Sequence, residues 1–333
     1  MLGKTQKLVL YGVVKYPELT DREVARRLGV TAVSFSQAKN ALAKKGLYTT
    51  RYIPAMQKLG HELLYISFGN LNPSIPDETR DNIGKVLNHE NVENFYTVLE
   101  SSHSINIASL RNYAEYTRNR AAFESICVAA GLVEEETFRH ILFPFEESVI
   151  QRFFDFAPLL NKFFGLGRED VFDGKKTVIE SAIVEDRQGE LTEMEKLVFY
   201  LLVKHPSITD MALSRISGTS RSKVSKLRRR FKDEEFLSRL NIPNVKALGL
   251  EMMGLFHVKM RTLKSLNSWR NANEVTGGPN ATVVISGGRE LIVIAGGICN
   301  FDTFTTRRDE LLSQYRKIGL FEGEPHYGLL SMH

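Results

Sequence analysis

The sequence predicts an α+β protein in tandem-repeat form, with two winged helix-turn-helix domains and two ferredoxin-like (βαββαβ) domains. Three observations support this prediction. The chain aligns with itself at a shift of 189 residues, each repeat opens with short helices that carry capping signals, and a βαββαβ order of apolar runs follows in each repeat.

The repeat is first visible in the stretches VKYPELTD and VKHPSITD. The gapless match extends from Lys7 to Glu62 against Lys196 to Glu251, and 17 of its 56 positions are identical. A second matched segment begins at Asn112 and at Asn300, after a one-residue slip. The chain is therefore interpreted as a duplication, and its period is too long for a solenoid.

The repeat divides the chain into five predicted segments. They are a winged helix-turn-helix at 1–60, a ferredoxin-like domain at 61–146, a helical linker at 147–190, a second winged helix-turn-helix at 191–250 and a second ferredoxin-like domain at 251–333. We call residues 1–146 copy one and residues 191–333 copy two.

The start of each copy carries the capping and termination signals of three short helices. In copy one, Pro17 ends the first helix, Thr20 and Glu23 form a capping box for the second, and Gly29 ends it. Thr31 then caps a third helix, as Ser220 does in copy two. The extended stretches TTRYIP and SRLNIP that follow are interpreted as a wing with its exit strand. A plain three-helix bundle with a surface arm is the alternative.

The third helix of each copy is the predicted DNA-reading element. Its expected inward residues are Phe35, Ala38 and Leu42 in copy one and Val224, Leu227 and Phe231 in copy two. The expected DNA-binding residues are Thr31, Ser34, Ser36, Gln37, Lys39, Asn40 and Lys44 in copy one, and Ser220, Arg221, Lys223, Lys226, Arg228, Arg229 and Arg230 in copy two. Copy one offers hydroxyl and amide groups for base edges, whereas copy two offers cations for phosphates and guanine.

The distribution of charge agrees with a polyanionic partner. The net charge of the chain is +5. Residues 2–60 carry 11 Lys and Arg against three Asp and Glu, and residues 191–250 carry 12 against six, so the rest of the chain is acidic. Positive charge is thus concentrated at the start of each copy, where double-stranded DNA is expected to bind. Two solvated basic faces are the alternative that charge alone leaves open.

The remainder of each copy follows a βαββαβ order. Copy one contains ELLYISFG, a polar helix, VENFYTVLE, HSINIASL, a long helix from Tyr113 to Ala130 and TFRHILFPF, and copy two repeats the order with GLFHVKM, ATVVIS, ELIVIAG and HYGLLSM as its strands. This order predicts a four-stranded antiparallel sheet with two helices on one face. The other face needs a cover, most simply a second such sheet.

Taken together, the helix-turn-helix, the Pro-then-Leu-Gly exit strand and the βαββαβ unit resemble the Lrp/AsnC (feast/famine) transcription regulators of bacteria and archaea. The resemblance covers Thr5–Phe145 and Thr192–Met332, and its most specific segments are TSRSKVSKLRRRF and ISGGRELIVIAG. It implies effector-responsive DNA binding, with βαββαβ domains that pair their sheets. Because this chain holds two copies, an intramolecular pseudo-dimer or a homodimer is expected.

The resemblance also implies an effector site, for an amino acid or another small metabolite. Its expected residues are Gly287, Gly288, Arg289 and Glu290, where glycines let a ligand approach and the flanking charges hold its termini. The alternative is that the two glycines only form a hairpin turn. The linker stretch EESVIQRFFDFAPLLNKFFGLG is expected to be a helix, broken near Pro158.

The expected function is that of a sequence-specific DNA-binding transcription regulator that is not an enzyme. The chain contains no HExxH, GxSxG or Gly-rich phosphate loop, and no cofactor or metal is expected. It lacks a membrane-spanning run and is expected in the cytoplasm. Two alternatives stay open. One is a fused haem-biosynthesis enzyme similar to the siroheme decarboxylases, which resemble Lrp/AsnC proteins. The other is a protein-interaction adaptor with degenerate winged helices.

Overall fold

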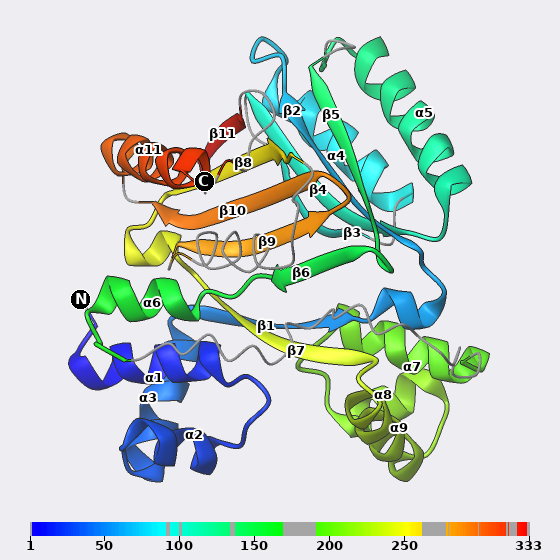
Figure 1. The fold of residues 1–333 in the computed structure, drawn as a ribbon. Helices are drawn as coiled ribbons and strands as arrows, with labels where there is room; N and C mark the ends of the chain where they lie inside the picture. Colours follow the sequence, from blue (N-terminus) through cyan, green and yellow to red (C-terminus); the bar gives the residue numbers. More distant parts are fainter. Residues whose placement is uncertain are drawn as a thin grey trace.

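The computed structural model describes residues 2–90, 94–99, 102–133, 137–168, 191–261, 278, 280–298, 300–317, 319 and 325–331. The end of the predicted linker and the predicted first helix of the second ferredoxin-like domain lie outside these residues. Within them, no helix is both long enough and apolar enough to cross a membrane. The predicted tandem α+β fold is confirmed (Figure 1).

Each copy opens with the three predicted helices. They are α1 (Lys4–Lys15), α2 (Asp21–Leu28) and α3 (Ala32–Lys44) in copy one, and α7 (Glu193–Lys204), α8 (Asp210–Ser217) and α9 (Arg221–Asp233) in copy two. The capping box of Thr20 and Glu23 is present. The α2 and α8 helices end at Gly29 and Gly218, which have φ values of +72° and +65°. These left-handed conformations favour glycine because it lacks a Cβ.

The predicted inward residues of the third helices are buried, apart from one. Phe35 and Leu42 are buried in α3, while Ala38 is half-buried. Val224, Leu227 and Phe231 are buried in α9. Phe231 packs edge-on against Phe199 of α7, with ring centroids 5.4 Å apart. Each helix-turn-helix unit thus has an apolar interior that fixes the direction of its third helix.

The extended segment after each third helix pairs with its counterpart in the other copy. β1 (Tyr48–Pro54) and β7 (Leu237–Pro243) form a two-stranded antiparallel ribbon. Arg51 pairs with Leu240, which is the equivalent position at the 189-residue shift. A pseudo-twofold axis therefore passes through this pair. The predicted wing strands are extended as expected, but they join the two copies rather than folding back onto their own units.

Each copy continues into an antiparallel sheet. In copy one it comprises β2 (Leu63–Asn70), β3 (Asn94–Leu99), β4 (His103–Leu110) and β5 (Phe138–Pro144), in the order β3-β4-β2-β5, with α4 (Asp77–Glu90) and α5 (Tyr113–Ala129) as its helices. In copy two it comprises β8 (Met252–Lys259), β9 (Ala281–Gly287), β10 (Glu290–Ile298) and β11 (His326–Ser331), with α11 (Phe301–Lys317). Its order β11-β8-β10-β9 repeats that of copy one.

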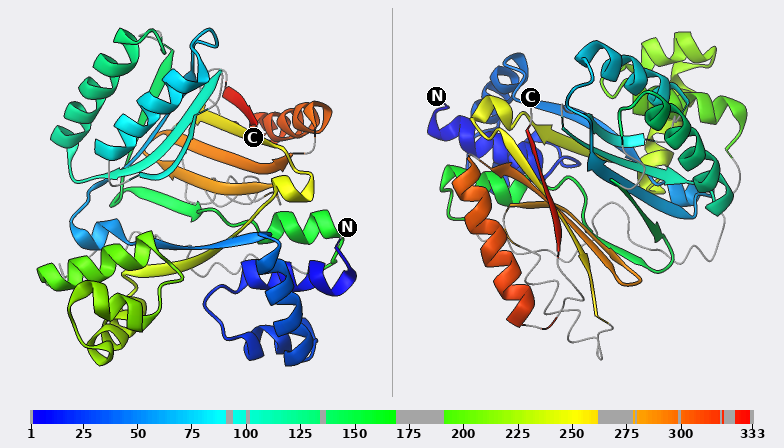
Figure 2. Two further views of the ribbon diagram at one scale, coloured as in Figure 1. Left: turned by 180° about the vertical axis from the view of Figure 1, so that it is seen from behind. Right: turned by 90° about the horizontal axis from the view of Figure 1, so that it is seen from above.

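The two sheets pack against each other through their helix-free faces (Figure 2). One continuous apolar core joins them, and it contains Leu64, Ile66, Phe68, Ile105 and Ile107 from copy one and Met253, Leu255, Val283, Ile285, Ile292 and Ile294 from copy two. The cover expected for the exposed sheet face is therefore the sheet of the other copy. The described chain forms an intramolecular pseudo-dimer.

The first part of the linker is a strand, which corrects the prediction of a helix. β6 (Ser148–Arg152) extends the sheet of copy two as a fifth strand beside β9. Its buried positions, Ser148, Ile150 and Arg152, alternate with more exposed ones, which is the period of a strand. The helix α6 (Ala157–Phe164) begins only afterwards, with Pro158 in its first turn, where proline is tolerated. Sheet-edge pairing thus overrides the helical pattern.

The ribbon is also held by a buried amide, which gives a test of the pairing. Asn241 is 5% exposed, and its Nδ2 donates to the Val13 carbonyl of α1 at 2.8 Å. Its Oδ1 accepts from Thr50 Oγ1 of β1 at 2.7 Å. We expect Asn241→Ala to lower the free energy of unfolding by about 1–3 kcal/mol, because it leaves these groups unsatisfied. Asn40→Ala, at an exposed position, should change it by less than about 0.5 kcal/mol in the same denaturant titration. Equal effects would contradict this role.

Candidate nucleic-acid interface and internal cavity

Four of the predicted DNA-binding cations of α9 face solvent. Arg221, Lys223, Lys226 and Arg229 are exposed, and they surround the buried stripe of the same helix. Ser220 starts the helix, and its Oγ accepts from the backbone N–H of Lys223 at 3.2 Å. The hydroxyl therefore acts first as a cap. The exposed cations form a surface that suits a phosphate backbone.

Other predicted cations are committed to contacts inside their own units. Arg228 Nε donates to Asp210 Oδ1 at 2.9 Å, and its Nη2 donates to the Ile208 carbonyl at 2.9 Å. Lys39 and Asp21, the equivalent pair of copy one, lie 2.6 Å apart. Arg230 bridges to Glu195 at 2.6 Å. The repeated pair joins the second helix to the third in both copies, which indicates a role in packing the helix-turn-helix.

The polar residues of α3 are accessible. Ser34, Gln37, Asn40 and Lys44 are exposed, whereas Ser36 is half-buried. The Thr31 hydroxyl accepts from the backbone N–H of Ser34 at 3.1 Å and caps the helix. The α3 surface thus presents amide and hydroxyl groups with few cations, in contrast to α9.

The two helix-turn-helix units lie on the same side of the molecule. Both project from the side of the β1–β7 ribbon that faces away from the two large sheets (Figure 1). Contacts between the copies fix their spacing: Lys232 of α9 pairs with Glu18 of copy one at 3.2 Å, and Glu18 also accepts from the backbone N–H of Arg239 at 2.6 Å. The unlike surfaces of α3 and α9 are therefore presented by one rigid pair of units.

The predicted effector residues form the tight turn between β9 and β10. Gly288 has a φ of +57°, as a two-residue hairpin requires. A Cβ on Gly287 would collide with Ser148 Oγ of β6, so this glycine admits the linker strand. Arg289 donates to the Met260 carbonyl at 3.1 Å, and Glu290 contacts His257 Nε2 at 2.7 Å. Each of the four predicted effector residues thus has a structural role within the sheet of copy two.

A basic cluster lies beside this turn, where the sheets meet. His257 of β8 packs against Phe68 of copy one with ring centroids 5.6 Å apart, and it stacks on His326 of β11 at 5.9 Å. Burial lowers the pKa of His257, although Glu290 opposes this effect. The pKa of His326 is lowered by burial and by the positive charges of Arg139 and His257. Sequence reasoning did not bring these residues together.

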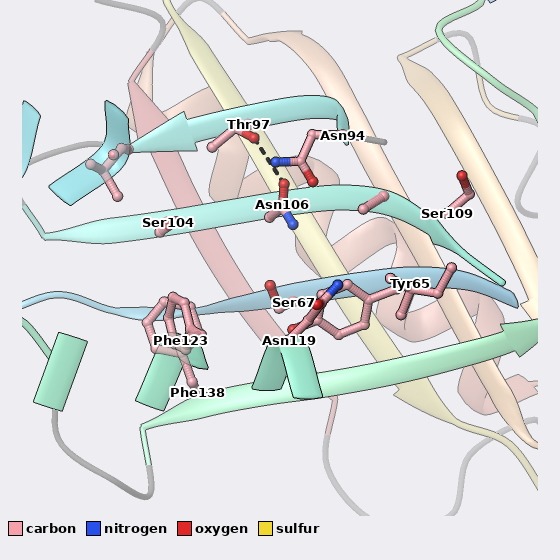
Figure 3. Close-up of a pocket in the computed structure, with 14 residues that line it drawn as sticks. Tyr65, Ser67, Asn94, Thr97, Ser104, Asn106, Ser109, Asn119, Phe123 and Phe138 are labelled. Atoms are coloured by element: carbon pink, nitrogen blue, oxygen red, sulfur yellow. Dashed lines mark hydrogen bonds between the residues drawn. The ribbon is translucent and has the colours of Figure 1, made fainter. Parts of the chain in front are cut away.

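A cavity with a volume of about 90 Å³ lies on the helix-covered side of the sheet of copy one (Figure 3). Its walls come from β2, β3, β4, α4, α5 and the start of β5. It is lined by Tyr65, Ser67, Gly84, Asn94, Thr97, Leu99, Ser104, Asn106, Ala108, Ser109, Leu110, Asn119, Phe123 and Phe138. None of these described lining residues carries a charge, and the polar ones contribute hydroxyl or amide groups.

The register of the two sheets shows which residues of copy two are equivalent to those that line the cavity of copy one. Ser67 pairs with Asn106 and Gly69 with Ser104 in copy one, and Phe256 pairs with Val293 and Val258 with Leu291 at the same places in copy two. Phe256, Leu291 and Val293 are at most 3% exposed, and Phe256 stacks on Phe304 of α11. At these described positions, copy two has large apolar side chains, whereas copy one has small polar ones.

Hydrogen bonds organise the polar wall of the cavity. Thr97 Oγ1 donates to Asn106 Oδ1 at 2.8 Å, and Figure 3 shows the amide nitrogen of Asn106 on the side of Ser67. The hydroxyl of Tyr65 lies 2.7 Å from His140 Nδ1. Burial raises the pKa of Tyr65 and is the main cause that lowers the pKa of His140, with Arg120 as a second cause. Both groups are uncharged at neutral pH, so this described part of the cavity wall is polar and uncharged.

The sequence contained a signal for this cavity. HSINIASL in copy one places Ser104 and Asn106 at alternate positions where ELIVIAG in copy two has Leu291 and Val293. A comparison of the two copies strand by strand would have found the difference. The prediction considered only the turn residues.

Comparisons with known proteins identify the fold but not the family. No protein-family model and no curated protein sequence matches the chain. The structure of the siroheme decarboxylase NirDL with an iron-uroporphyrin III analogue is similar, with a TM-score of 0.51 and 11% identity over 98% of this chain and 90% of that one. The similarity shows that the tandem fold of this chain is shared along almost its whole length.

Single-copy regulators also align with the chain. The regulator NMB0573 of Neisseria meningitidis, in complex with L-Met, has 16% identity and a TM-score of 0.36, and it covers 42% of this chain and 90% of its own. An AsnC-family regulator of Agrobacterium tumefaciens has 10% identity and a TM-score of 0.32, with 42% and 89% coverage.

The full-length comparison corrects one expectation. The chain was expected not to be an enzyme, and the structure that matches it over both copies is a decarboxylase. Because the same tandem architecture carries an enzyme, the lack of short catalytic motifs is no ground for excluding catalysis. That exclusion is wrong.

The lowered pKa of His140 makes stability depend on pH. As the pH falls through the ordinary histidine value of about 6.5, the unfolded chain binds a proton that folded His140 does not. The free energy of unfolding should therefore fall below that pH, by at most about 1.4 kcal/mol per pH unit for one proton. We expect His140→Gln to reduce this slope between pH 7 and 5, whereas Asn119→Ser, without a titrating group, should keep it. An unchanged slope in His140→Gln would contradict the assignment.

Proposed function

We propose that the chain binds duplex DNA through α3 and α9 and acts as a transcription regulator. The single observation that carries this proposal is the geometry of the paired units. Two exposed third helices project from one side of the molecule and are held together by the β1–β7 ribbon. One helix surface is rich in cations and the other in amides and hydroxyls. In this arrangement, one chain contacts one site with two unlike helices.

The exposed cations of α9 supply the non-specific part of the affinity. Lys223, Lys226 and Arg229 neutralise phosphates, which releases counterions and makes binding depend on salt. Arg228 was predicted to share this role, but its bonds to Asp210 and Ile208 favour a role in holding the helix. The proposal therefore assigns phosphate contact to the exposed residues first.

A salt titration tests this assignment. We expect Arg229→Ala to weaken binding to all duplexes and to reduce the slope of log affinity against log salt by about 0.9 for each lost phosphate contact. Lys44→Ala, at an exposed cation of α3, provides a comparison within copy one. The measurement is fluorescence anisotropy with specific and random duplexes at several salt concentrations. An unchanged slope for Arg229→Ala would remove α9 from the interface.

Base selection is assigned to α3. Gln37 and Asn40 are exposed and carry amides, which can pair bidentately with adenine. We expect Gln37→Ala and Asn40→Ala each to cost about 1–3 kcal/mol on the preferred site and little on random DNA. The preferred site would first be found by selection from a random duplex library. Equal losses on both kinds of DNA would contradict base reading by α3.

A second candidate is tetrapyrrole chemistry, and the basic cluster at the sheet junction favours it. NirDL is a siroheme decarboxylase and shares the tandem fold. A tetrapyrrole substrate carries carboxylates, for which Arg139 offers a cationic partner and His257 and His326 offer imidazole hydrogen-bonding groups. The cavity of copy one suits such a substrate less, because its volume is only about 90 Å³.

An absorbance titration with an iron porphyrin distinguishes this candidate. If the chain binds a tetrapyrrole, the Soret band of the iron porphyrin should shift on binding. The double variant His257→Gln with His326→Gln should bind the porphyrin about tenfold or more weakly, because the two imidazoles are lost. Duplex binding by the same double variant should be unchanged. The absence of any shift for the wild-type chain would exclude the candidate.

A further inference from the structure

We propose that one face of α7 pairs with the same face of α7 in a second copy of the chain, as two antiparallel helices related by a twofold axis. This face carries Glu193, Leu197, Tyr200 and Lys204, and we call it the α7 stripe. All four residues are exposed. The proposal does not depend on DNA binding, because the association of two copies is measured on the chain alone.

The α7 stripe exposes apolar side chains whose equivalents are covered in copy one. Tyr200 is 43% exposed, whereas Tyr11, its equivalent on α1, is only 2% exposed. Leu197 is 40% exposed, whereas its equivalent Leu8 is half-buried and packs against the main core. The same two residue types are thus present in both copies and are left at the surface in copy two.

In copy one, the linker helix α6 packs against α1. The ring centroid of Phe164 at the end of α6 lies 5.7 Å from Lys7 Nζ of α1. Just after α6, Arg168 donates to the carbonyls of Arg27 and Leu28 at the end of α2. The fold therefore shows, within the same chain, that the first helix of a helix-turn-helix unit accepts a second helix on its outer side.

The charges at the two ends of the α7 stripe favour a second copy as the occupant. Glu193 begins α7 and Lys204 ends it, so an antiparallel neighbour of the same sequence places each acid opposite a base. The equivalent positions of copy one are Lys4 and Lys15, whose like charges would repel each other in such a pair. The α7 stripe is therefore complementary to itself, and the matching face of α1 is not.

The spacing along α7 also suits a pair of helices. The four residues of the α7 stripe follow one another at intervals of four, three and four positions, which keeps them on one side of a helix. The axis that pairs the charged ends places Leu197 opposite Tyr200 of the second copy. Lys204 Nζ donates to the Tyr200 hydroxyl at 2.8 Å, so the cation is held along the same face. The contact thus has an apolar centre and charged ends.

A contact of this size predicts weak association. Stable interfaces bury about 1,200–2,000 Å² in total, and one side of a 12-residue helix supplies only part of that area. We expect a Kd on the order of 100 µM. At low micromolar concentration the chain is then mainly monomeric.

Sedimentation velocity of the full-length chain without DNA, from about 5 to about 500 µM, tests the proposal. We expect a monomer at the lowest concentration and a growing fraction of dimer above about 100 µM. A chain that stays monomeric throughout would overturn the proposal. It would do so even if a peptide with the sequence of α6 binds the chain, because that result would assign the α7 stripe to a foreign helix.

Charge reversal locates the contact. We expect Glu193→Lys and Lys204→Glu each to weaken dimerisation about tenfold, because each variant opposes like charges at both ends of the pair. An equimolar mixture of the two variants should recover the dimer, since one chain then offers two bases and the other two acids. Lys4→Glu, the equivalent exposed change on α1, should leave association unchanged. Wild-type dimerisation by both variants, or no recovery in their mixture, would remove α7 from the contact.

A change at the centre of the α7 stripe provides a second test that leaves the charges in place. Leu197→Gln removes apolar surface from the contact and should weaken dimerisation about fivefold or more. The position is exposed in the single chain, so the variant should fold, as far-ultraviolet circular dichroism would show. Dimerisation of folded Leu197→Gln at wild-type strength would contradict the proposed pairing.

Discussion

The face-to-face packing of the two antiparallel sheets is the interaction on which the rest of the molecule depends. Each sheet has one apolar face, and the side chains of Leu64, Ile66, Leu255 and Ile294 meet in a core that neither copy could bury alone. The β1–β7 ribbon repeats the same pseudo-twofold relation below the sheets. Together they set the distance between α3 and α9. Any function of the paired helices therefore rests on the contact between the copies.

Covalent linkage allows the two halves of this pseudo-dimer to differ. In a homodimer, one sequence must serve both sides of the axis, whereas here each copy can change by itself. The third helix is cationic in copy two and rich in amides in copy one. The helix-facing side of the sheet has Phe256 in copy two where copy one has Ser67. Gly287, in turn, admits the linker strand β6 that extends the sheet of copy two. The two copies therefore share one architecture and differ in the side chains that they present on it.

Much of this could be predicted from the sequence because it rests on local signals. Capping at Thr20 and Thr31 and the apolar stripe of Val224, Leu227 and Phe231 follow from short-range rules, and both are confirmed. The strand β6 could not be recognised, since its pairing with β9 is a long-range contact that outweighs a helical pattern of phenylalanines. The ion pair of Arg228 with Asp210 and the cluster of His257 with His326 were missed for the same reason. The cavity depends on which residues of two paired strands lie side by side, and the sequence of a single strand does not show this.

The central claim is that the fold is completed by contact between the copies. It is tested most directly by the concentration dependence of thermal unfolding, compared between the intact chain and a chain cut at a protease site inserted between residues 168 and 191. The account predicts a midpoint that is independent of concentration for the intact chain and one that rises with concentration for the cut chain, because the contact has become intermolecular. Two separated halves that each unfold cooperatively, with midpoints that do not depend on concentration, would contradict it.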